Sequence, residues 1–310
     1  MAAMIESLFV TRTPAWHNLG VILPESPTSA DAIVAAGLDW TVHQQPMYLE
    51  NGMEVPNAYA NVRDKDSSVL GIVGNRYQIV QNTEAFDFTD NLIGEGCVYE
   101  SAGSLRDGKQ IWLLAHLPEA MQIAGDDVMP YLCFTNTHDG TGSVKCFATS
   151  IRVVCNNTLS AALSTAKRTW SARHTGSIDA KLAQATETLQ LANKYMAELK
   201  KGCEKLALKN IDQDKLIGFI NQLLPETDDM TSKARQNLKD VKNDIWIRYT
   251  YAPDLVDREQ TMLRFLQAVS DSASHREPTR LTKNWRENRF MNLVGGNELI
   301  DKAYQIALTA

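Results

Sequence analysis

The residues with the clearest potential for binding chemistry lie between positions 140 and 178. This stretch contains no Asp or Glu. Five cations and one tryptophan stand in it, namely Lys145, Arg152, Lys167, Arg168, Arg173 and Trp170. Basic side chains beside an aromatic ring that can stack on a base are typical of a groove for single-stranded nucleic acid. We therefore predict that the cations contact phosphate and that Trp170 stacks on a base.

The charge of the rest of the chain makes this stretch stand out. The chain has a formal charge of −6, and the stretch alone contributes +5, so the remainder sums to −11. A polyanion would be repelled by most of the protein and could bind only where cations cluster. The alternative interpretation is a solvated basic surface beside a buried tryptophan. A second basic cluster at residues 276–289 has a formal charge of +3 and contains Trp285.

Cysteine and histidine offer a different chemistry. Cys133, His138, Cys146 and Cys155 are zinc-ligand types, but their spacing lacks the short cysteine pairs of structural zinc sites. Cys155 could also be a nucleophile, with His138 as its base and Asp139 as the orienting group. Cys155 ends an apolar run, which favours a core thiol, and His-Asp-Gly is also ordinary turn chemistry. We predict neither a metal nor a cofactor.

Local patterns predict the elements that must position these residues. We expect helices at residues 29–36 and 82–93 and from 156 onward, and strands at 38–43, 47–55, 69–80, 97–102, 110–117, 131–136 and 144–154. Ser29 or Asp31 is expected to cap the first helix. Asn51-Gly52 predicts a type I′ hairpin turn. Gly71 and Gly74 indicate a bulge or a close backbone approach.

The chain changes character after residue 178. Apolar residues from Leu182 to Leu206 recur at steps of three and four, which predicts one long helix. We expect this helix to lie on the β core, with a helix hairpin or a subunit contact as alternatives. The rest is expected to be helical, with breaks at Pro225, Pro253 and Pro278. The predicted fold is α+β, with an antiparallel core domain at 1–175 and a helical region at 176–310.

Composition sets the broad class of protein. With 310 residues and 44% hydrophobic residues, the chain can bury a substantial core. Its five cysteines include no C-x-x-C pair, as expected in a reducing compartment. We see neither an apolar signal segment nor an apolar run of the roughly 20 residues that span a bilayer. We therefore expect a soluble, cytoplasmic protein without a membrane partner.

Several motifs resemble those of one protein family. They are Trp16-His-Asn-Leu-Gly20, Gly37-Leu-Asp-Trp40, Leu70-Gly-Ile-Val-Gly-Asn-Arg-Tyr77, Ser101-Ala-Gly-Ser104, Asn136-Thr-His-Asp-Gly140 and Arg152-Val-Val-Cys-Asn-Asn-Thr-Leu159. The order of these motifs resembles the domain of unknown function 932 family, the phage/plasmid-like proteins of bacteria. That resemblance implies a mobile-element setting and no particular chemistry. The order of strands followed by a helix near 156 also looks like the β-β-β-α core of phage single-strand annealing recombinases, which implies a homo-oligomer.

These observations support three functions of different classes. The first is a single-stranded DNA-binding and annealing protein of a phage, prophage or plasmid, acting in recombination or replication without ATP. The second is a host-takeover or anti-defence protein that binds a bacterial partner protein through its acidic surface. The third is a hydrolase that uses Cys155. The basic stretch favours the first function, the acidic remainder favours the second, and the third depends on residue identity alone.

Overall fold

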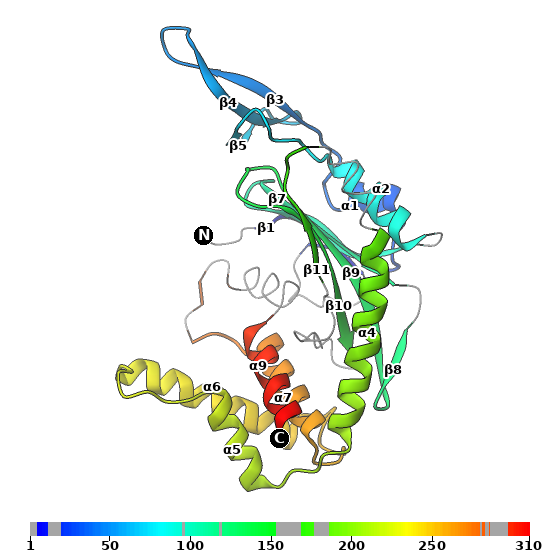
Figure 1. The fold of residues 1–310 in the computed structure, drawn as a ribbon, viewed down its shortest axis with the longest axis vertical. Coiled ribbons are helices and arrows are strands. Elements are labelled where there is room, and N and C mark those ends of the chain that lie inside the picture. Colours follow the sequence, from blue (N-terminus) through cyan, green and yellow to red (C-terminus); the bar gives the residue numbers. More distant parts are fainter. Residues whose placement is uncertain are drawn as a thin grey trace. The chain divides into compact units, whose positions relative to one another are not determined.

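The computed structural model describes residues 5–11, 20–94, 97–117, 120–152, 169–176, 186–279, 281–282, 285 and 297–310. Contacts divide the chain into two compact units. The first contains residues 1–118, 131–148 and 168–193, and the second contains residues 119–130, 149–167 and 194–310. Strands dominate the first unit and helices the second (Figure 1). The sequence-based boundary at residue 175 stays a prediction.

The larger sheet has eight strands. Seven of them follow the order β11-β10-β9-β7-β6-β1-β2, and β8 pairs with β9. These strands are β1 (Ile5–Thr11), β2 (Val21–Leu23), β6 (Tyr99–Leu105), β7 (Gln110–His116), β8 (Met121–Ile123), β9 (Asp126–Thr137), β10 (Val144–Arg152) and β11 (Thr169–Ala172). Residues 111–115 of β7 are all buried, so this central strand is covered on both faces.

A smaller antiparallel sheet belongs to the first unit. It contains β3 (Val42–Tyr48), β4 (Glu54–Arg63) and β5 (Val69–Val73), with β4 in the middle. The hairpin at Asn51-Gly52 is confirmed, but the type I′ turn is wrong. Gly52 has a φ of +81° whereas Asn51 is not among the residues with positive φ, and a type I′ turn needs positive φ at both. The amide of Leu49 donates to the carbonyl of Met53 at 2.7 Å, which closes a three-residue loop.

Two helices complete the first unit, α1 (Ser29–Ala35) and α2 (Asn82–Ile93). The prediction for 82–93 is confirmed, and the expected apolar stripe from Ala85 to Ile93 is buried. Gln81 and Glu84 form a capping box at its start, which satisfies two backbone amides that the helix leaves open. The predicted cap of α1 is wrong, because the N-cap is Thr28.

The C-terminal part of the chain is helical, as predicted. It contains α4 (Thr186–Ala207), α5 (Gln213–Leu223), α6 (Ser232–Tyr251), α7 (Met262–His275) and α9 (Glu298–Thr309). Each predicted proline break follows a helix end within three residues. The seam residues Met196, Leu199, Cys203 and Leu206 are buried. Gly202 of α4 lies against the hydroxyl of Tyr304 in α9, so this end of the seam packs on another helix of the same chain.

The α+β fold class with an antiparallel core is therefore confirmed. Several strands have other limits than predicted. β3 begins at Val42 and β5 ends at Val73. The strand predicted at 47–55 is wrong, because residues 48–54 form the hairpin tip and β4 spans Glu54–Arg63. Residues 169–172 form strand β11 where we expected the chain to continue from a helix. The helix expected from residue 156 lies outside the described residues.

Candidate anion-binding cleft

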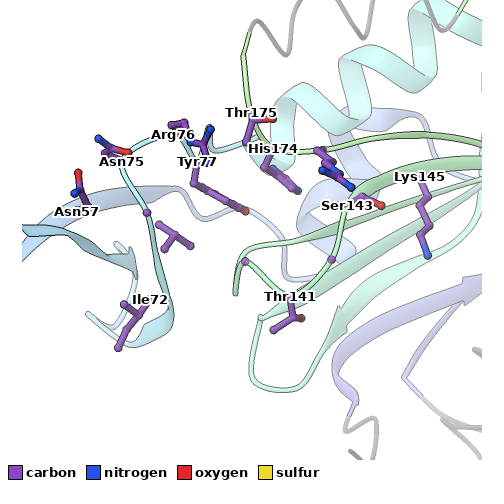
Figure 2. A pocket seen from close by; sticks show the side chains of 15 residues that line it. Asn57, Ile72, Asn75, Arg76, Tyr77, Thr141, Ser143, Lys145, His174 and Thr175 are labelled. Carbon is purple, nitrogen blue, oxygen red and sulfur yellow. The ribbon is translucent and has the colours of Figure 1, made fainter.

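A cleft of about 1030 Å³ opens in the first unit. Three chain segments that are distant in the sequence line it, and Asn57 of β4 joins them. The segments are residues 72–77 after β5, residues 140–145 around the start of β10, and residues 173–175 after β11. Figure 2 shows side chains from all three segments around one space. The fold thus gathers parts of the chain that lie about 100 residues apart.

Three cations line this cleft, Arg76, Lys145 and Arg173, and all three side chains are exposed. The lining residues that the structure describes include no Asp or Glu. Arg76 and Lys145 form no ion pair with any described residue. Lys145 and Arg76 lie at opposite ends of the cleft (Figure 2). A cation cluster in a lining with no described acidic residue attracts anions, and its spread favours an extended anion over a single small one.

A close backbone contact brings two of the segments together. At Gly71 a Cβ would lie 2.7 Å from the carbonyl oxygen of Asp139, so only glycine lets β5 approach the loop before β10 this closely. The loop holds its own shape through Asp139, whose carboxylate accepts hydrogen bonds from the amide and the hydroxyl of Thr141 at 2.9 and 2.7 Å. The close backbone approach predicted at Gly71 is therefore confirmed.

The floor of the cleft contains two buried rings. Tyr77 and His174 stack with centroids 4.6 Å apart, and both residues line the cleft. The Tyr77 hydroxyl donates to the carbonyl of Thr137 at 2.6 Å, and Nδ1 of His174 lies 2.9 Å from the carbonyl of Gln78. Burial raises the pKa of Tyr77, and the nearby Asp139 adds to the shift. The phenol therefore stays neutral and fixes the turn that carries Arg76.

A second polar network joins His138 to Asn82. Nε2 of His138 is 3.1 Å from Oδ1 of Asn82. Because Nδ2 of Asn82 donates to the carbonyls of Leu38 and Trp40, its Oδ1 must accept, and His138 carries its proton on Nε2. Burial lowers the pKa of His138 to about 3, with His174 as a second cause. His138 is thus a neutral core residue.

The structure separates the predicted contact residues. Lys145 and Arg173 line the cleft. Trp170 pairs with Cys146 across β10 and β11, whereas Lys145 pairs with Ser171. Because neighbouring residues of a strand point to opposite faces, Trp170 and Lys145 lie on opposite faces of the sheet. The ring of Trp170 stacks on Phe88 of α2 with centroids 6.1 Å apart.

The other predicted contact residues do not line the cleft or lie outside the described residues. Arg152 is the last residue of β10, about 23 Å along the strand from Lys145 at 3.3 Å per residue. Lys167 and Arg168 lie outside the described residues. In the second basic cluster Arg276 caps the end of α7, and Arg280, Lys283, Arg286 and Arg289 lie outside the described residues.

The metal alternative meets a geometric obstacle. The ring of Phe134 packs at a tilt against Phe88 of α2, and His138 contacts Asn82 at the start of α2. Cys133 is one residue away from Phe134 and five residues away from His138. Because side chains alternate along a strand, the side chain of Cys133 lies on the opposite face of β9. Cys133 and His138 therefore do not converge on one ion. Within the described ranges no group of three or more metal-ligand side chains comes together. Cys155 lies outside them.

Sequence reasoning missed Arg76 as a contact residue. It stands outside the acid-free stretch, in the motif Leu70-Gly-Ile-Val-Gly-Asn-Arg-Tyr77. The structure brings that motif and a second one, Asn136-Thr-His-Asp-Gly140, to the cleft. The usable signal was a cation two residues after Gly74 and five after Gly71, because glycines mark places where the backbone can approach another segment closely.

Nothing in the described part of the chain combines the length and apolar character of a membrane-crossing helix.

The fold is α+β, and its first unit contains a cleft lined by three cations and, among the described lining residues, no Asp or Glu. The chain belongs to the family described as Domain of unknown function (DUF932), whose model matches residues 69–293. The match contains every segment of the cleft except Asn57. Neither the curated proteins nor the solved structures give a match.

Proposed function

We propose that this protein binds single-stranded DNA through the cleft and acts without ATP in recombination or replication of a phage, prophage or plasmid. The observation that supports this most is the grouping of Arg76, Lys145 and Arg173 without an acidic side chain among the described lining residues. In a chain with a formal charge of −6, such a grouping selects where a polyanion can bind.

The composition of the cleft favours recognition of the backbone over the bases. Beside the cations the lining includes the hydroxyl of Ser143, a group that can donate to a phosphate oxygen. The rings of Tyr77 and His174 are already stacked on each other, and Trp170 is on another face. We therefore propose binding with little sequence preference and without base stacking on Trp170.

The direct experiment is fluorescence anisotropy with a labelled single-stranded oligonucleotide, its duplex, and several salt concentrations. Three phosphate contacts predict a slope of log K against log salt of about −2 for single strands. Affinity should then fall roughly 20-fold between about 50 and 200 mM salt. Tight binding with a flat salt dependence, or no binding at low salt, would contradict the proposal.

A bacterial partner protein remains the second candidate, and the observation behind it is an exposed apolar and acidic hairpin. Tyr48 and Met53 of that hairpin are 59% and 58% exposed. If oligonucleotides fail to bind while the folded protein forms a defined complex with one host protein, this second function replaces the first.

A further inference from the structure

The tip of the β3–β4 hairpin, residues 48–54, has the opposite character to the cleft. All seven residues are exposed. The tip carries Glu50 and Glu54 and no Lys, Arg or His. It also presents Tyr48, Leu49 and Met53, which are 59%, 51% and 58% exposed. Apolar side chains gathered with like charges on a projecting turn are typical of a protein contact.

The cleft offers a matching surface. It has three cations and no acidic side chain among its described lining residues, and Ile72 at its edge is 59% exposed. A positive surface facing a negative one steers association and fixes its geometry. The volume of about 1030 Å³ is at the upper end for small-molecule sites, which leaves room for the side chains of a two-stranded turn.

The apex of the tip, residues 50–52, cannot reach the cleft of its own chain. Asn57 of β4 lines the cleft, and residues 50–52 lie five to seven residues before it, along an extended strand. At 3.3 Å per residue the separation is about 17–23 Å, and the hairpin projects away from the β5 turn (Figure 1). The occupant must therefore come from another molecule.

We propose that the hairpin tip of one copy of this chain docks in the cationic cleft of a second copy. Glu50 and Glu54 of the tip pair with Arg76 and Lys145, and Tyr48 or Leu49 packs on Ile72. The two surfaces differ, so the contact is heterologous and leaves a free tip and a free cleft at the ends, which allows rings or longer chains. A seven-residue tip is smaller than the 20–30 residues a side of stable interfaces, so the contact is weak and reversible.

Sedimentation velocity without nucleic acid tests this contact. In about 50 mM salt the weight-average sedimentation coefficient should rise between about 1 and 100 µM protein. It should stop rising in about 500 mM salt, because the pairing is ionic. A wild-type protein that stays monomeric over this whole range would overturn the proposal.

A charge exchange makes the test specific. Glu50→Lys with Glu54→Lys gives a basic tip, and Arg76→Glu with Lys145→Glu gives an acidic cleft. Each double variant alone should associate at least about tenfold more weakly than wild type, because like charges then meet. An equal mixture of the two should restore association, since each tip then meets a cleft of opposite charge.

The matched control is Glu25→Lys with Glu277→Lys, which changes net charge by the same amount at exposed positions elsewhere. This control should associate like wild type. A mixture of the exchange variants that stays monomeric, or a control that also dissociates, would contradict the proposal and indicate either a different occupant or a general charge effect. Circular dichroism confirms that each variant is folded. The outcome does not depend on DNA binding, so either proposal can fail alone.

Discussion

Gly71 lies directly against the backbone of Asp139, with no room for a side chain between them. We expect Gly71→Ala to destabilise the protein by about 1–3 kcal/mol, because backbone must shift to accept the methyl group. Gly74→Ala is the matched control. A Cβ there would meet only the carbonyl of Asn57, at 3.8 Å, so its effect should stay within about 0.5 kcal/mol. Urea denaturation measures both, and equal stabilities would show that the contact is dispensable.

The contact of Gly202 with Tyr304 gives a second prediction. Gly202→Ala should lower stability despite the better helix propensity of alanine, because the methyl group meets the tyrosine hydroxyl. Tyr304→Phe removes that oxygen and should recover most of the stability in the double variant. Gly218→Ala in α5 has no atom within 4 Å of the added Cβ. It should therefore stabilise the protein by about 0.5–1 kcal/mol. If Tyr304→Phe does not restore stability to the Gly202→Ala variant, the loss of stability has a cause other than the tyrosine hydroxyl.

His138 predicts a pH dependence of stability. Its pKa is lowered from 6.5 to about 3 in the folded protein. Below pH 6.5, His138 therefore binds a proton in the unfolded chain and stays neutral in the folded protein. The free energy of unfolding should thus fall as pH falls from 6.5 toward 3, by about 2 kcal/mol between pH 6.5 and 5.

The comparison variant for this prediction is His138→Gln, which can keep a donor toward Asn82 but cannot take up a proton. Urea denaturation at several pH values should show a shallower acid dependence for the variant. Identical slopes would mean that other groups dominate the acid response.

Trp170 separates packing from nucleic-acid binding. Trp170→Ala removes the stack on Phe88, and we expect stability to fall by about 1–3 kcal/mol, less than for a fully buried ring. Anisotropy with the folded variant should give an unchanged affinity for single-stranded DNA. An affinity that falls by about 1–3 kcal/mol would instead support base stacking by this ring.

Sequence patterns predicted the local elements better than the site. The helix at 82–93 could be predicted because its apolar residues recur at helical spacing and Gly94 follows directly, where a helix can end. Lys145 and Arg173 were found because charge is visible in composition. Arg76 was missed because its proximity to them depends on Gly71 and Asp139 meeting, although these two residues are 68 positions apart. The separation of Trp170 from Lys145 follows from the β10–β11 register, which no local pattern specifies.

The measurement that tests the central claim most directly compares two double charge reversals in the same anisotropy titration at low salt. Arg76→Glu with Lys145→Glu reverses the cleft. Lys233→Glu with Lys239→Glu makes the same change in net charge on exposed positions of α6. The account predicts that the cleft reversal weakens single-stranded DNA binding about 100-fold or more, because each attraction that is removed or becomes a repulsion is worth roughly 1 kcal/mol. It predicts that the α6 reversal changes affinity less than about threefold. Equal effects from both reversals would contradict a dedicated cleft.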